Sequence, residues 1–145
     1  MDKKIKDTLN YIIELKPDIT LKRLQSTLYL THAYTLALDG KPLSTEKFRA
    51  WHSGPTLKSV YNKFKNYKTL TRLNGISELT EDEKDLIEDV IYLYSRFSDE
   101  TLSEHIMNTD TAYIEARRGL RSLDPCYNEL SNETIRRQYL ELIND

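Results

Sequence analysis

The sequence predicts a mainly α-helical protein, and three observations support this class. Apolar residues recur at helical spacing, beginning with Ile5, Leu9, Ile12 and Ile13. Residues that cap helices precede several apolar stretches, and glycine and proline are few, with four of each. We expect one domain over residues 1–145, a compact bundle of about six to seven helices. A short extended segment or small hairpin is expected near residues 43–54.

The first two helices are expected on either side of Pro17. The first covers about residues 3–15, and Pro17 ends it because proline has no backbone N–H to donate. Thr20 is a suitable N-cap for the second helix, which Gly40 ends. Because this second helix is apolar on most sides, we expect it to be the buried centre of the protein.

The stretch Pro42–Pro55 does not fit a helix. Its inward positions alternate as in a short strand or hairpin, and they are Phe48, Ala50 and His52. Pro55 is expected to be the first residue of a third helix, a position that tolerates proline. The apolar face of that helix is Leu57, Val60, Tyr61 and Phe64.

The second half of the chain has the clearest capping signals. Thr80 and Glu83 form a capping box at the start of a fourth helix. The buried face of that helix is expected to be Leu86, Ile87, Val90, Ile91, Tyr94 and Phe97. Ser98 caps a short fifth helix, a sixth starts near Thr111, and Ser131 caps the last.

Composition favours a soluble, cytoplasmic protein. Cys126 is the only cysteine, so an intrachain disulfide is excluded and a reducing compartment is expected. The N-terminus is polar without the apolar region of a signal peptide, and no apolar run is long enough to span a membrane. The charge is divided between the halves: residues 1–72 carry 14 Lys/Arg against 6 Asp/Glu, and residues 73–145 carry 7 against 17. Such a field guides association, unless the two halves fold together and partly cancel.

No catalytic or metal pattern is present, so we expect no enzyme, no metal and no cofactor. His32, His52 and His105 are scattered, and no Gly-rich phosphate loop occurs. A nucleophilic pair of Cys126 with His105 is an alternative, but a lone cysteine is more often inert. The acidic run 81–89 has the spacing of a solvated helix face that begins at a cap.

A polar stripe crosses the otherwise apolar second helix. Gln25, Tyr29 and His32 lie at i, i+4 and i+7, with Lys22 one turn earlier. Either these side chains hold the stretch Phe48–Pro55 in place, or they line a groove beside Trp51 where a partner docks, since aromatic residues dominate interface energetics. A second pattern interleaves cations with aromatic residues: Lys58, Tyr61, Lys63, Phe64, Lys65, Tyr67, Lys68 and Arg72. It is either the solvent-exposed face of an amphipathic helix or a surface that contacts the phosphates and bases of a nucleic acid.

Two blocks of the chain resemble the Panacea-domain family of antitoxins, which includes phage-associated GepA-like and SocA-like proteins. Residues 21–34 are similar to the family's Leu-Gln-Lys-Leu-Leu-Tyr-Leu-Ala-His helix. Residues 40–43 and 48–55 are similar to its second block, with the signature Ala-Trp-x-x-Gly-Pro. Residues 79–83 match more weakly. The chain departs from the family at Ile106-Met107, where Thr-His is frequent, and at Ala112-Tyr113, where Pro-Trp occurs.

The resemblance implies an antitoxin that neutralises a cognate toxin by direct protein–protein interaction. The SocA-like branch implies an alternative, an adaptor that delivers the toxin to a bacterial protease. A nucleic-acid-binding regulator that uses the basic stretch is a third hypothesis, and the divided charge permits a homo-oligomer. The residues expected to bind the partner or to support the site are Lys22, Gln25, Tyr29, His32, Trp51, Gly54 and Pro55.

Overall fold

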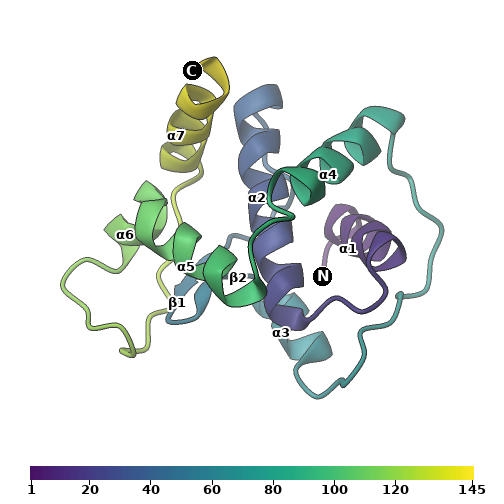
Figure 1. Cartoon of the computed structure of the whole chain (residues 1–145), viewed down its shortest axis with the longest axis horizontal. Helices are drawn as coiled ribbons and strands as arrows, with labels where there is room; N and C mark the ends of the chain where they lie inside the picture. Colours follow the sequence, from purple (N-terminus) through teal and green to yellow (C-terminus); the bar gives the residue numbers. More distant parts are fainter.

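One long central helix organises the molecule (Figure 1). The computed structural model describes residues 1–145. In chain order the elements are α1 (Lys3–Leu15), α2 (Leu21–Asp39), β1 (Arg49–Trp51), β2 (Gly54–Thr56), α3 (Lys58–Phe64), α4 (Glu81–Leu93), α5 (Asp99–Thr109), α6 (Thr111–Ala116) and α7 (Asn132–Asn144). Helix α2 packs against α1, α3, α4, α5, α7 and β2, and most of its residues are buried. The mainly α class, the small hairpin and the central second helix are thus confirmed.

The predicted helix ends are confirmed where local capping determines them. The hydroxyl of Thr20 accepts the N–H of Arg23 at the start of α2, and Gly40 ends that helix with a φ of 70°. Thr80 and Glu83 form the capping box of α4. The hydroxyls of Ser98 and Ser131 accept the N–H groups of Thr101 and Thr134 at the starts of α5 and α7.

Three local predictions were wrong. Pro55 lies in β2 opposite Ala50, and α3 begins only at Lys58. The fixed φ of proline also suits an extended strand. In the pair Ala50–Pro55 the backbone N–H positions point away from the partner strand, so the missing N–H of proline costs no hydrogen bond between β1 and β2. His52 is in that turn and exposed, not inward. Helix α4 ends at Leu93, so Phe97 is not on its buried face. Phe97 lies in the connection between α4 and α5 and packs against the core there.

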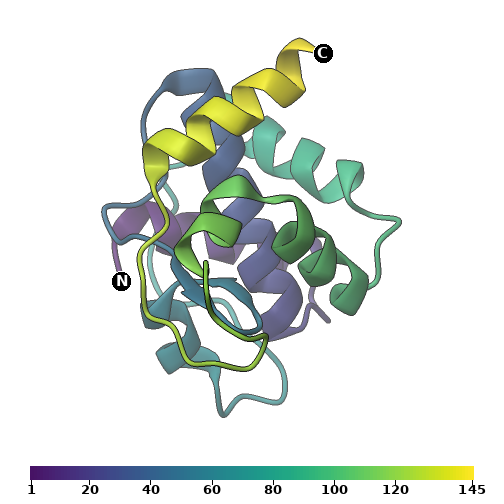
Figure 2. The same cartoon turned by 90° about the vertical axis from the view of Figure 1, so that its left-hand side faces the viewer.

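A distant segment extends the hairpin. The backbone N–H of Ala50 donates to the carbonyl of Asn128 at 2.9 Å, and Leu130 donates to Phe48 at 2.8 Å. Residues 128–130, just before α7, therefore lie along the free edge of β1 (Figure 2). Because β1 is paired on both sides, its backbone donors and acceptors are satisfied and the hairpin is held firmly.

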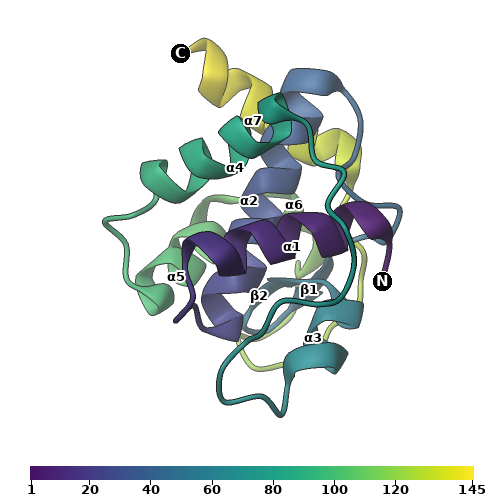
Figure 3. The ribbon, with the colours of Figure 1, turned by 90° about the vertical axis from the view of Figure 1, so that its right-hand side faces the viewer.

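The connection between α3 and α4 is fastened to α1, which lies across α2 (Figure 3). The side-chain amide of Asn10 donates to the carbonyl of Leu73 at 3.0 Å and accepts its N–H at 2.7 Å. Asp7 accepts the N–H of Glu78 at 3.0 Å. A single apolar core runs from Ile5 to Tyr139. None of the helices combines the length and the apolar composition that crossing a bilayer requires.

Candidate functional site

A groove opens beside Trp51, between the N-terminal end of α2 and the hairpin. Its cavity volume is about 200 Å3. The residues that line it are Leu21, Lys22, Gln25, Ser26, Trp51, Ser53, Pro55, Thr56 and Tyr61. Of the residues expected from the sequence, the structure brings Lys22, Gln25, Trp51 and Pro55 together here. Gly54 lies between the last two in the chain, with a φ of 118° that favours glycine.

Trp51 packs against two tyrosine rings. Tyr61 of α3 meets it edge to face with ring centroids 4.8 Å apart, and Tyr127 does so at 6.3 Å. Beyond Tyr61, a second hollow of about 360 Å3 is lined by Trp51, His52, Tyr61, Leu123, Pro125, Cys126 and Tyr127. Tyr61 was expected to face the core, but 36% of it is exposed. We refer to the two hollows on either side of Trp51 and Tyr61 as the Trp51 groove.

The hairpin behind Trp51 is held by α6 and the residue that follows it. The hydroxyl of Tyr113 donates to the carbonyl of Trp51. The guanidinium of Arg117 donates to the carbonyl of Ala50 and to that of Asp124, both at 2.8 Å. Tyr113 is one of the two residues that stand where the resembled family has Pro-Trp, so this departure lies directly behind the groove.

Two polar groups at the groove differ in how they are satisfied. The amide of Gln25 donates to the carbonyl of Leu57 at 3.1 Å and accepts its N–H at 3.0 Å, so it fixes the start of α3. The indole Nε1 of Trp51 is shielded and has no acceptor in the chain. It is the one buried side-chain polar atom of the structure without a partner. An unpartnered buried donor costs about 1–3 kcal/mol, and native structures contain few such groups.

The other half of the polar stripe is closed. Tyr29 is fully buried, and its hydroxyl donates to a carboxylate oxygen of Asp110 at 2.7 Å. The hydroxyl of Tyr139 donates to the same oxygen at 2.8 Å, and the N–H of Tyr113 donates to the other at 2.9 Å. Asp110 is therefore both the N-cap of α6 and the junction of α2 with α7. Burial raises the pKa of Asp110 above its usual value, although these three bonds oppose the shift.

His32 is also sealed in the core. Its Nδ1 accepts the N–H of Leu43 at 3.3 Å, so Nε2 carries the proton and faces Oδ1 of Asn132 at 3.1 Å. Its ring packs on Phe48, with centroids 5.0 Å apart. Burial lowers the pKa of His32 from 6.5 to about 4, and the charge of Lys47 adds to the effect. Tyr29 and His32 thus support the hairpin from inside and do not line the groove.

The basic stretch has no uniform role. Lys58, Lys63, Lys65 and Lys68 are exposed and form no ion pair. The guanidinium of Arg72 instead donates to the carbonyl of Gly75 at 2.9 Å, inside the loop. Lys58 lies three residues before Tyr61 on α3, and Lys65, the C-cap that follows α3, lies four residues after it, so both are neighbours of Tyr61 on the helix surface.

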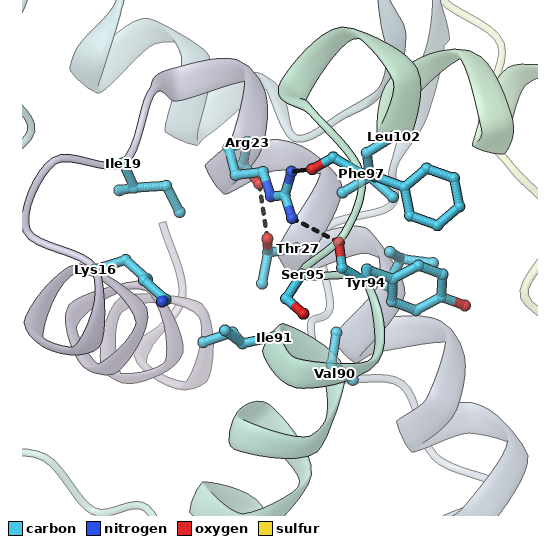
Figure 4. Close-up of a pocket in the computed structure, with 11 residues that line it drawn as sticks. Lys16, Ile19, Arg23, Thr27, Val90, Ile91, Tyr94, Ser95, Phe97 and Leu102 are labelled. Atoms are coloured by element: carbon cyan, nitrogen blue, oxygen red, sulfur yellow. Dashed lines mark hydrogen bonds between the residues drawn. The ribbon is translucent and has the colours of Figure 1, made fainter.

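A third hollow, of about 260 Å3, lies between the end of α1, the start of α2, and α4 and α5 (Figure 4). The guanidinium of Arg23 donates to the carbonyls of Phe97 and Tyr94 at 2.6 and 2.8 Å. The hydroxyl of Thr27 donates to the carbonyl of Arg23 at 2.8 Å. These polar groups satisfy the backbone where α4 ends, which is a structural role.

No group of three His, Cys, Asp or Glu side chains is placed to hold a metal ion. Cys126 is buried, and its thiol faces the carbonyl of Ala116 at 3.7 Å. His105 packs on Phe97 with ring centroids 5.0 Å apart. The cysteine and the histidine thus have separate partners, and their arrangement gives no support to the alternative of a nucleophilic pair.

The fold and the groove define a class: a small helical protein whose one hairpin, held from both sides, presents an aromatic cleft. A family model described as "Antitoxin SocA-like, Panacea domain" matches residues 24–112, more than half of the chain. The chain therefore belongs to this antitoxin-like Panacea-domain family. No curated protein and no solved structure matches it.

The residues matched by the family model include only part of the groove. Gln25, Trp51 and Tyr61 lie within the matched residues, whereas Lys22 precedes them and Tyr127 follows them. The hollow between α2 and the hairpin is thus built mostly by the shared part of the chain. Sequence reasoning missed Tyr127, together with Leu123 and Arg117. Their only signal was a loop rich in arginine and large apolar residues, which by itself does not indicate where the loop folds.

Proposed function

We propose that this protein is an antitoxin that neutralises a cognate toxin by direct protein–protein interaction at the Trp51 groove. Membership of the antitoxin-like family supports the partner class. The observation that carries the site is the position of Trp51, which lies between two hollows and packs against two partly exposed tyrosines. Tryptophan and tyrosine are the residues in which binding energy concentrates at interfaces.

The rigidity of the hairpin supports the proposal. Backbone bonds from residues 128–130, Tyr113 and Arg117 fix the strand that carries Trp51. A partner that binds here does not have to order a mobile loop, so less conformational entropy is lost on association. The two hollows offer room for side chains on both sides of one fixed aromatic anchor.

The first experiment is co-expression. The product of the neighbouring gene is induced in a bacterial host alone, with this protein, and with its Trp51→Ala variant, and growth is recorded. We expect arrest with the product alone, rescue by the unmodified protein and loss of rescue with the variant. A product that is harmless alone, or that stays toxic beside this protein, contradicts the proposal.

The half-life of the toxin separates neutralisation from delivery to a protease. Direct neutralisation leaves the half-life unchanged or lengthens it while growth is rescued. A half-life that shortens only when this protein is present supports the adaptor alternative. The matched control for Trp51→Ala is Tyr92→Ala, which is expected to rescue growth as the unmodified protein does. Tyr92 is exposed on α4 and lines neither hollow of the groove.

A further inference from the structure

We infer that the basic rim of the Trp51 groove recognises an acidic segment of the partner protein. The inference rests on the proposed function, since it concerns the same groove, and it adds the chemistry of what binds there. We define the basic rim as Lys22, Lys58 and Lys65. Lys22 lines the hollow itself, and the other two are neighbours of Tyr61 on the helix surface.

The rim cations have no partner within the chain. All three are exposed, and none approaches a carboxylate within ion-pair distance. Lys3, Lys4 and Lys84 by contrast each pair with a carboxylate, Lys3 with Asp7 at 3.0 Å. The carboxylate that does reach α3 is that of Glu46, and it is engaged by the backbone N–H and the hydroxyl of Ser59. It acts as a cap for the helix, and the rim charge remains free.

The largest group of acidic side chains in the protein, that of α4, lies away from the rim. The exposed carboxylates of α4 are Glu81, Asp82, Asp85, Glu88 and Asp89. Helix α4 lies in the upper part of the views of Figures 1 and 3, and α3 lies at the bottom of both. Exposed charges are screened over about 10 Å in moderate salt. Two carboxylates lie closer: Asp99 contacts Thr20 and Arg23 at the start of α2, and Glu46 contacts Ser59. Neither forms an ion pair with a rim lysine, so the rim presents three unpaired cations to a partner.

The observations favour an acidic polypeptide over a nucleic acid. The net charge is −2 and the pI is about 6.0, whereas nucleic-acid-binding domains are usually strongly basic. Tyr61 and Tyr127 pack edge to face against Trp51, so part of its aromatic surface is already engaged within the chain and less is left for stacking on bases. The amide of Gln25 is bound to the backbone of Leu57 through both N and O, so it is not free to read a base edge.

Fluorescence of Trp51, the only tryptophan in the chain, provides the test. The full chain is titrated with a short peptide rich in Glu and Asp that carries one central Leu. The matched probes are the same peptide with Lys in place of the acids and a single-stranded oligothymidylate. We expect a saturable change in emission with the acidic peptide only, and an affinity that falls about tenfold from about 50 to about 300 mM NaCl.

Charge-reversal variants locate the binding. Lys22→Glu and Lys58→Glu are each expected to weaken the acidic peptide about threefold to tenfold. Lys41→Glu changes the net charge equally but lies at the other end of α2, and it should change the affinity less than about twofold. Equal effects of all three substitutions, or no response to the acidic peptide, would overturn the inference.

Two other occupants are outcomes of the same experiment. Tighter binding of the oligothymidylate than of the acidic peptide assigns the rim to nucleic acid and overturns the inference. Self-association in sedimentation runs that Lys58→Glu abolishes assigns the rim to the α4 face of a second copy, which also overturns it.

The two proposals can fail separately. If co-expression rescues growth while Lys22→Glu and Lys58→Glu rescue equally well and the acidic peptide does not bind, the antitoxin function stands and the acidic recognition is wrong. If the peptide binds at the rim but no neighbouring product is neutralised, the recognition stands and the antitoxin function is wrong.

Discussion

At the N-terminal end of α2, Lys22 and Gln25 line a groove that is open to solvent, whereas Tyr29 and His32 further along the same stripe are sealed in the core. The residues share one helix face and similar polarity. What differs is the covering: the hairpin leaves a gap over the first end, and the Asp110 junction and Asn132 close the second. The open end is therefore expected to govern binding, and the closed end stability.

The largest expected effect is a loss of stability when the closed end of the stripe is disrupted. Asp110→Ala removes the cap of α6 and leaves the hydroxyls of Tyr29 and Tyr139 buried without an acceptor. We expect the free energy of unfolding to fall by about 4 kcal/mol, measured by urea denaturation. Tyr139→Phe, which removes one hydroxyl, should cost about 1 kcal/mol. If Asp110→Ala is as stable as Glu115→Ala on the exposed side of α6, the junction has no structural role.

The next effect is a pH dependence that comes from His32. The unfolded chain binds a proton near pH 6.5, but in the folded protein burial lowers the pKa to about 4. The stability is therefore present above pH 6.5 and lost as the pH falls toward 4, by about 3 kcal/mol in total.

Urea titrations at several pH values check this loss. His32→Gln has no such group, so its free energy of unfolding should decline less between pH 6.5 and 4 than that of the unmodified protein. His52→Gln, in the exposed turn, should follow the unmodified protein. Parallel pH curves for the two variants would contradict the assignment to His32.

The smallest of the three effects concerns the open end. Trp51→Ala is expected to weaken binding of the purified toxin by about 2 kcal/mol, or roughly 30-fold in Kd, measured by calorimetry. Tyr29→Phe should lower stability by about 1 kcal/mol and leave that Kd unchanged. A comparable loss of affinity in both variants would mean that the two ends do not differ in role.

The sequence predicts this fold well where a structural signal is local. Thr20, Thr80, Ser98 and Ser131 begin helices because each cap needs only the next three residues. Pro55 was assigned to a helix because its local chemistry fits both a helix start and an extended strand. The choice is made by pairing with β1, which local sequence does not show.

The candidate site follows the same division. Lys22, Gln25 and Trp51 are close in the chain and were expected together, and one groove does contain them. Tyr127 and Tyr113 reach the hairpin from more than sixty residues away, through contacts that no periodicity predicts. The helical spacing of Tyr61 with Leu57 and Phe64 predicts that it faces the core, but in the structure it lies at the exposed edge of that face.

The segment 128–130 that pairs with β1 has a consequence for biosynthesis. Residues 49–56 leave the ribosome long before their edge partner, and contacts of such large sequence separation form late and slowly. The cleft around Trp51 therefore takes its final shape only after residues 128–130 have emerged. A nascent chain stalled before residue 128 would expose an unpaired strand edge and would offer a cognate toxin an incomplete surface.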